Sequence, residues 1–152
     1  MNLKRASIHN ANVIWEMQVN SFQSLLDKYQ DFETSPANED VELIHRRLEQ
    51  PFTYYYFIYH NNEIAGAIRI VDKHDDSPKR ISPIFILPKY RNLGLAQRAI
   101  EAVEVIHGST NWMLNTILEE KGNCYLYEKL GYERFGELNR INDNLTLINY
   151  RK

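Results

Sequence analysis

The chain has 152 residues, of which 43% are hydrophobic and 25% are charged, and this composition fits one globular domain that needs neither disulfides nor a structural metal. Its formal net charge of −2 argues against a surface built to bind a polyanion such as DNA. The single cysteine, Cys124, cannot form a disulfide within the chain, and the five histidines are scattered without metal-ligand spacing. We therefore expect one domain over residues 1–152, with no metal site and no nucleic-acid partner.

The N-terminal residues lead into polar sequence and lack the apolar segment of a secretory signal peptide. No stretch approaches the roughly 20 apolar residues that a membrane helix requires. The sequence thus predicts a cytoplasmic protein that does not contact membranes.

The first part of the chain predicts one strand followed by two helices. Residues 3–7 are typical of a short strand. Apolar residues then recur at helical spacing, namely Val13, Met17, Phe22, Leu25 and Leu26. After a loop over residues 31–38, Asn38 is a candidate N-cap for a second helix that ends near Pro51. Glu39 and Asp40 suit the positive end of that helix.

The central part predicts a three-stranded meander. Residues 52–59 are rich in aromatic side chains and indicate a strand, and residues 63–71 indicate its partner. Asn61 and Asn62 lie between them, and asparagine tolerates the left-handed backbone of a tight hairpin. A second turn over residues 75–78 precedes a third strand over residues 80–87.

The last part predicts a helix, a strand, a helix and a terminal hairpin. The first helix covers residues 96–106 and directs four apolar residues to the core, Ala99, Ile100, Val103 and Ile106. A strand over residues 112–118 and a helix over residues 123–130 follow; a further strand begins at residues 132–136, and residues 145–150 close the chain. This order favours a mixed α/β (α+β) domain built around one sheet.

The junction between the third meander strand and the following helix is a candidate anion site. The first N–H groups of a helix have no partners within the helix, and the helix dipole places positive charge there. Gly94 lies at this helix start and carries no Cβ, so a phosphate can approach the backbone closely. Helix–strand packing alone also explains a glycine at such a junction.

Two segments resemble motifs of the GNAT superfamily of N-acetyltransferases. Residues 91–96, Arg-Asn-Leu-Gly-Leu-Ala, resemble its Q/R-x-x-G-x-G/A motif, and residues 126–132, Leu-Tyr-Glu-Lys-Leu-Gly-Tyr, are similar to its [LF]-Y-E-K-x-G-[FY] segment. The match covers most of the chain and is sharp from Ile84 to Tyr132. The resemblance implies a GNAT-like fold: a single, mostly antiparallel sheet of six to seven strands, splayed in the middle, with helices on both faces. It also implies transfer of an acetyl group from acetyl-CoA to a primary amine by direct attack on the thioester.

The resemblance further implies where acetyl-CoA binds. Backbone groups of the strand at Ile86 would pair with the pantetheine arm. The pyrophosphate would lie on the motif itself, formed by Arg91, Asn92, Leu93, Gly94, Leu95 and Ala96. Asn123 either contacts the pantetheine or caps its helix.

Tyr127 matches the tyrosine that protonates the departing thiolate in many family members; ordinary core packing is the alternative reading. Some family members carry a glutamate on the strand before the pyrophosphate motif, and this chain has none there. Glu120, with Glu119 beside it, is the remaining candidate for the general base, although both also suit a solvated loop. Cys124 is expected to be a small buried side chain without a catalytic role.

By the same resemblance, residues 15–40 and 138–145 would shape the acceptor pocket. The acidic residues of the first region suit a cationic acceptor, a small-molecule or peptide amine. Homodimers are common among similar proteins, but no residue pattern here specifies an interface. The alternative function is a CoA-binding domain without turnover that acts as a sensor or an interaction module.

Overall fold

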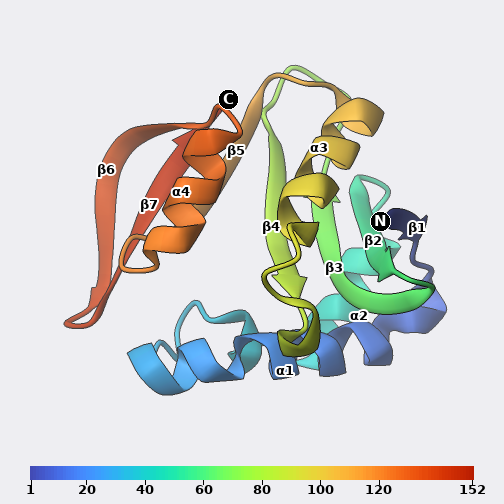
Figure 1. Cartoon of the computed structure of the whole chain (residues 1–152), viewed down its shortest axis with the longest axis horizontal. Coiled ribbons are helices and arrows are strands. Elements are labelled where there is room, and N and C mark those ends of the chain that lie inside the picture. The colour runs from blue at the N-terminus through green and yellow to red at the C-terminus, as the bar shows by residue number, and fades with distance from the viewer.

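The computed structural model describes residues 1–152 and contains one sheet of seven strands in the order β1-β2-β3-β4-β5-β7-β6 (Figure 1). All neighbouring strands are antiparallel except β4 and β5, which are parallel. The strands are β1 (Asn2–Arg5), β2 (Thr53–His60), β3 (Glu63–Val71), β4 (Lys79–Ile86), β5 (Trp112–Ile117), β6 (Glu133–Asn142) and β7 (Leu145–Arg151). The predicted element order and fold class are confirmed.

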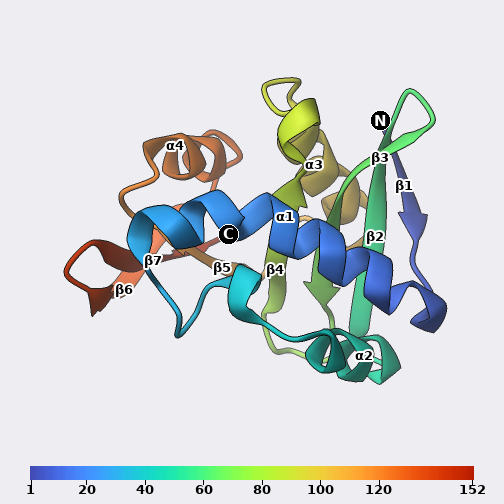
Figure 2. The same cartoon turned by 90° about the horizontal axis from the view of Figure 1, so that it is seen from below.

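Helices lie on both faces of the sheet, as expected. They are α1 (Ala11–Tyr29), α2 (Val41–Glu49), α3 (Leu95–His107) and α4 (Lys121–Lys129), with short 3-10 turns at Ile8–Asn10, Pro36–Asn38 and Pro88–Tyr90. Figure 2 shows α3 and α4 on one side and α2 on the other, while α1 runs across one end of the strands. Several elements therefore meet at the end of the sheet that α1 crosses.

The turns follow the chemistry of their residues. Asn61 and Asn62 both have positive φ, 49° and 65°, and close the β2–β3 hairpin as predicted. β6 is longer than the sequence suggests: it continues to Asn142 because the strand passes Gly136 (φ 71°) through an irregularity in its pairing with β7. A residue in the left-handed region without a Cβ lets the strand bend and resume.

One predicted helix cap is wrong, and two apolar residues of the predicted helices are exposed: Val13 by 44% and Ile106 by 55%. In α1 the buried residues include Leu26 of the predicted spacing, but also Ile14 and the polar Gln18, which the spacing does not contain. The N-cap of α2 is Asp40, whose carboxylate accepts a hydrogen bond from the Leu43 N–H at 2.9 Å. The Asn38 side chain donates to the Phe32 carbonyl oxygen instead, at 2.6 Å.

The core consists of two clusters, one on each face of the sheet. The larger one joins β2, β3 and β4 to α3 and continues to α4 and β7 through Tyr127, Tyr132 and Tyr150. The smaller one packs Tyr55 and Phe57 of β2 against α1 and α2. Apolar burial of this extent supplies most of the stability of a domain of this size, and it fixes both halves of the sheet around the gap described next.

Candidate active site

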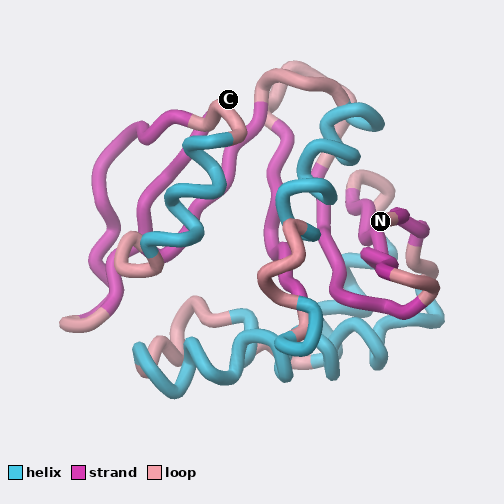
Figure 3. The backbone as a smooth tube through the Cα atoms, viewed as in Figure 1, coloured by secondary structure: helices cyan, strands magenta, loops and turns pink.

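β4 and β5 pair only at one end and then separate. Their register covers Lys79 with Trp112 and Arg80 with Met113, and β5 continues from there with β7 (Figure 3). The two strands therefore form a V that is closed at Lys79 and open toward Ile86. This is the splayed sheet that the sequence predicts.

The open edge of β4 carries backbone groups available to a ligand. The Leu87 N–H donates to the Ala65 carbonyl oxygen of β3 at 2.7 Å. Because bonded and non-bonded residues alternate along an antiparallel pair, the backbone groups of Ile86 and Ile84 point away from β3 and into the gap. β4 thus offers one strand edge for a ligand with alternating donors and acceptors.

The chain after β4 presents a run of free backbone amides. No backbone N–H from Asn92 to Gln97 has an acceptor in the chain, and α3 begins within this run at Leu95. Asn92 and Gly94 both have positive φ, 64° and 72°, which turns successive N–H groups to the same side. A Cβ built on Gly94 would meet no atom within 4 Å, so the glycine is required by its backbone conformation. This geometry suits an anion.

Arg91 holds this loop in place. Its guanidinium donates to the Ile86 carbonyl oxygen (3.1 Å) and to the Ser21 carbonyl oxygen of α1 (2.8 Å). Its own N–H is bonded to the Pro88 carbonyl oxygen at 3.3 Å. The structure therefore gives Arg91 a positioning role, and its contact with a phosphate remains a prediction.

A cavity of about 660 Å³ follows the loop and the β4 edge. It is lined by nearly all residues that the resemblance assigns to the cofactor, namely Ile86, Arg91, Asn92, Gly94, Leu95, Ala96 and Asn123, and by the two candidate catalytic residues, Glu120 and Tyr127. Leu93 does not line it and is 47% exposed. Asn123 lies inside α4, which begins at Lys121 after the N-cap Glu120, so the alternative in which Asn123 caps the helix is excluded.

Tyr127 projects from α4 between this cavity and a second one. The side chain is 7% exposed and packs edge-on against Tyr132 and beside Tyr150, so the packing reading is correct, while the acid role stays a prediction. Burial, followed by the nearby Cys124, raises the pKa of the Tyr127 hydroxyl to about 12, and no hydrogen bond contributes to the shift. The hydroxyl is therefore protonated at neutral pH.

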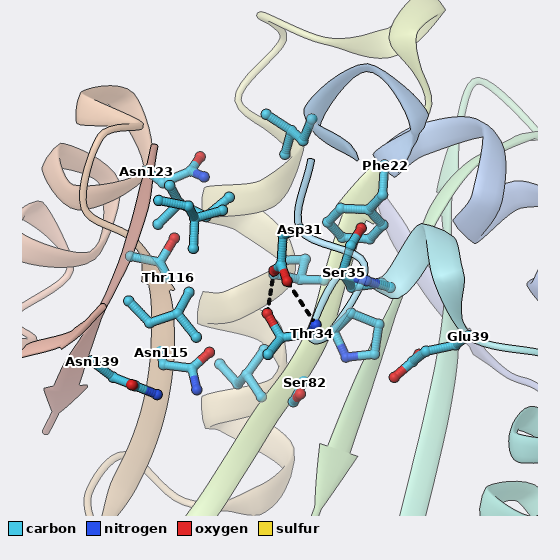
Figure 4. A pocket seen from close by; sticks show the side chains of 18 of the residues that line it. Phe22, Asp31, Thr34, Ser35, Glu39, Ser82, Asn115, Thr116, Asn123 and Asn139 are labelled. Atoms are coloured by element: carbon cyan, nitrogen blue, oxygen red, sulfur yellow. Dashed lines mark hydrogen bonds between the residues drawn. The ribbon is translucent and has the colours of Figure 1, made fainter. Parts of the chain in front are cut away.

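The second cavity, of about 410 Å³, occupies the gap between β4 and β5 (Figure 4). It shares five wall residues with the first, Phe22, Leu25, Ile84, Asn123 and Tyr127. At its other end it reaches Glu39 and Arg47. Two cavities that meet at Tyr127 and Asn123 are suited to two reactants approaching from opposite sides.

The walls of this second cavity agree in part with the sequence. The loop after α1 contributes Asp31, Thr34 and Ser35, and the hairpin contributes Asn139 and Leu145. Asn115 and Thr116 of β5, Ser82 of β4 and Arg47 of α2 were not predicted. Only the polar Asn-Thr pair in an otherwise apolar strand gives a signal in the sequence.

Asp31 is the cavity carboxylate without a cationic partner. It is 4% exposed and accepts hydrogen bonds from the N–H groups of Glu33 (3.1 Å) and Thr34 (2.9 Å) and from the Thr34 hydroxyl. Glu39, by contrast, forms a bidentate salt bridge with Arg47, with distances of 3.1 and 3.0 Å. A buried carboxylate without a counterion favours a positively charged ligand.

Neither candidate base lines the second cavity. Glu120 accepts hydrogen bonds from the Tyr29 hydroxyl (2.5 Å) and from the Lys28 ammonium (3.0 Å). The Tyr29 bond, with Lys28 behind it, lowers the pKa of Glu120 below the usual carboxyl range despite partial burial. Glu119 accepts from the Thr146 N–H at 2.9 Å and lines neither cavity. A lowered pKa makes Glu120 a weaker base.

Cys124 is buried, 3% exposed, with its sulfur near the Ile117 and Leu118 carbonyl oxygens at 3.9 and 3.8 Å. No group of three or more histidine, cysteine, aspartate or glutamate residues is placed to hold a metal ion. None of the helices has the length and apolar character needed to cross a membrane.

Comparison with known proteins gives a family and a fold. Residues 19–132 match the model of the acetyltransferase (GNAT) family. No curated protein sequence matches the chain. The structure is similar to spermidine N-acetyltransferase from Vibrio cholerae, solved with CoA and spermine (TM-score 0.75, 16% identity, 98% of this chain and 92% of that one). It is also similar to an acetyltransferase from Thermus thermophilus (TM-score 0.70, 13% identity, 99% and 96%).

A protein described as a streptothricin acetyltransferase from Bacillus anthracis, solved with acetyl coenzyme A, is similar over a shorter stretch (TM-score 0.58, 23% identity, 69% of this chain and 64% of that one). At these identities the structural likeness concerns the fold, whereas the family match covers most of the chain. The chain therefore belongs to the acetyltransferase (GNAT) family and is an acetyl-CoA-dependent N-acetyltransferase.

Proposed function

We propose that this enzyme transfers an acetyl group directly from acetyl-CoA to the primary amine of a small-molecule or peptide acceptor. Acetyl-CoA would occupy the larger cavity and the acceptor the smaller one. One observation carries this proposal: the two cavities meet at a common wall that contains Tyr127 and Asn123. A thioester placed there is reachable by an amine from the acceptor side.

The backbone positions acetyl-CoA in this proposal. The free amides from Asn92 to Gln97 would bind the pyrophosphate, since they combine unpaired N–H groups with the positive end of α3. The pantetheine arm would pair with the edge of β4 at Ile84 and Ile86. Together these contacts direct the thioester into the V between β4 and β5.

The bound ammonium first gives a proton to water in the acceptor cavity, and the neutral amine nitrogen then attacks the thioester carbonyl carbon and forms the new C–N bond. The C–S bond breaks, and the departing thiolate takes the proton of the Tyr127 hydroxyl. Thiols titrate near ~8.5 in water, and burial keeps the Tyr127 hydroxyl protonated, so it holds a proton for the developing thiolate. Its raised pKa also makes it a weaker acid than a tyrosine in water. The nitrogen gives up a second proton to water in the acceptor cavity, and proton exchange with water restores the tyrosine.

Asp31 supports an amine as the acceptor. It lies within the acceptor cavity with no cation beside it, and Figure 4 shows it between the Asn123 end and the Glu39 end. Its charge would concentrate ammonium groups near the thioester. Spermine in the Vibrio cholerae structure is a ligand of the same chemical type.

The experiment is a thiol-release assay with acetyl-CoA and a panel of primary amines, with the acetylated product identified by mass spectrometry. We expect release of CoA that depends on the amine. Binding of acetyl-CoA with only slow, amine-independent release would overturn the proposal in favour of a CoA-binding module without turnover.

A further inference from the structure

A buried polar cluster lies at the end of the acceptor cavity that is farthest from Tyr127. Glu39 and Arg47 form its cavity wall, and Gln18 of α1 donates from Nε2 to the Glu39 carboxylate at 2.8 Å. Arg69 of β3 and Tyr55 of β2, which pair across the sheet, lie behind this wall. The cluster thus holds two guanidinium groups and one carboxylate, which leaves an excess positive charge in a largely buried place.

Arg69 has no counterion. Ile68 and Ile70 belong to the core beneath α3, so strand alternation places Arg69 on the opposite face, toward α2. The side chain is 9% exposed and forms no salt bridge; its one hydrogen bond runs from Nη1 to the Ser82 carbonyl oxygen at 2.8 Å. Burial, with Arg47 beside it, lowers the pKa of Arg69 to about 10. Buried charge is unfavourable unless paired, so the site is incomplete by itself.

Hydrogen-bond donors also exceed acceptors in this cluster. The Arg69 Nε and the Tyr55 hydroxyl are both fully buried without a partner, and the one unpartnered acceptor near them is the Gln18 Oε1. Arginine offers five N–H donors, of which Arg69 uses one. Unused donors and a positive charge together favour an anion with several acceptor oxygens.

We propose that the acceptor is an amine that also carries a carboxylate, and that this carboxylate binds at Arg47, in front of the buried charge of Arg69, while the amine faces Tyr127. This inference rests on the proposed function. Arg47 lines the cavity; Arg69 does not, but it donates to the carbonyl oxygen of Ser82, which does. Asp31 lies between the two ends and matches the ammonium, while the far end holds two guanidinium groups against the single carboxylate of Glu39.

A plain polyamine fits this arrangement less well. Its second ammonium would lie at the Arg47 end, where two guanidinium groups, Arg47 and Arg69, outnumber the one carboxylate, Glu39. Like charges at close range oppose binding. The carboxylate thus distinguishes the acceptor inferred here from the spermine of the Vibrio cholerae structure.

Matched acceptor pairs test the inference. We would measure kcat/KM for free lysine against cadaverine and lysinamide, and for β-alanine against ethylamine, since each pair differs at the carboxylate. We expect the carboxylate-bearing member to be preferred by about tenfold or more, as for a buried charge pair. Calorimetry of free lysine and lysinamide with the CoA-bound protein measures the same preference without turnover.

Arg69→Met removes the charge and keeps the length of the side chain. We expect it to abolish the preference while the thermal shift with acetyl-CoA is unchanged, and to melt no lower than the wild type because an unpaired buried charge is lost. Arg151→Met, on the exposed end of β7, is the matched control and should keep the preference. If Arg69→Met does not fold, Arg69→Lys keeps the charge but loses the planar fork and should reduce the preference.

The inference would be overturned if kcat/KM for the carboxylate-free amines were equal or higher, or if the calorimetric affinities did not depend on the carboxylate. Either result would leave the proposed function intact. Absence of thiol release with every amine would instead overturn the proposed function, and the calorimetric comparison would still decide whether the carboxylate is recognised.

Discussion

At the scale of single residues, Tyr127 carries the chemistry of the proposed reaction. Tyr127→Phe should lower kcat by about 10²–10⁴-fold, the range typical of a lost general acid, with unchanged affinity for acetyl-CoA. Stability should change little, because no hydrogen bond contributes to the environment of this hydroxyl. Steady-state kinetics and CoA titration measure both effects. Tyr125→Phe is the matched control, since Tyr125 lies on the same helix and is 70% exposed. Unchanged kcat in Tyr127→Phe would remove this tyrosine from the mechanism.

The residues that line the larger cavity were largely predictable from the sequence, and those that line the smaller cavity were predictable only in part. Residues 91–96 form one continuous turn, and their local sequence fixes the positive φ of Gly94 and the start of α3. The acceptor cavity is assembled from separate elements, with Arg47, Ser82 and Asn115 each on a different one. No local pattern encodes their meeting. Arg69 in particular lies between two isoleucines and shows its burial only when the sheet is folded.

At the scale of elements, a clasp of Tyr29, Lys28 and Glu120 joins the end of α1 to the start of α4. We expect Glu120→Gln and Tyr29→Phe to be non-additive in unfolding free energy, with a coupling of about 1 kcal/mol at pH 7. The folded-state pKa of Glu120 is lowered, so the unfolded chain binds its proton first as pH falls. The stabilisation is therefore present above the ordinary carboxyl pKa and is lost as pH falls through the folded-state value. Urea unfolding of the four proteins at pH 7 and near pH 3 measures this.

The same two variants distinguish a structural role of Glu120 from a role as the general base. If Glu120 only fixes α1 to α4, both variants should change kcat alike and by a few-fold at most. Loss of kcat in Glu120→Gln alone, together with loss of the acid limb of the pH profile, would assign Glu120 the proton-accepting role that its sequence position suggests.

Element types were predictable because each follows a strong periodicity or a turn residue, as at Asn61 and Asn62. Which face of an element is buried was less predictable. In α1 the chain buries Gln18, which bonds the Pro36 carbonyl oxygen and Glu39, in place of an apolar residue. Because a polar residue occupies the inner face, apolar spacing alone does not identify every buried position, and Val13, which belongs to that spacing, is exposed. This departure from the pattern occurs beside the polar cluster at the end of the acceptor cavity.

At the scale of the whole molecule, two halves of a sheet are held apart so that a ligand can lie between them. α1 crosses the open end of the V in Figure 1 and is tied to both halves. Arg91 bonds it to the loop after β4, and Asn142 of β6 donates to the Tyr29 carbonyl oxygen at 3.0 Å. The gap is therefore a fixed feature of the fold that binding does not have to create, which reduces the conformational cost of binding.

Hydrogen exchange tests this arrangement across the molecule. Without ligand, the amides from Asn92 to Gln97 should exchange fast, because they have no acceptor, while those of α3 beyond Arg98 exchange slowly. CoA should protect both this run and the amides of Ile84 and Ile86. Pantetheine, which lacks the pyrophosphate, should protect only the β4 amides and leave the run at the start of α3 unprotected. Protection of that run by pantetheine, or its continued fast exchange in the presence of CoA, would show that the phosphates bind elsewhere and that the free amides serve another purpose.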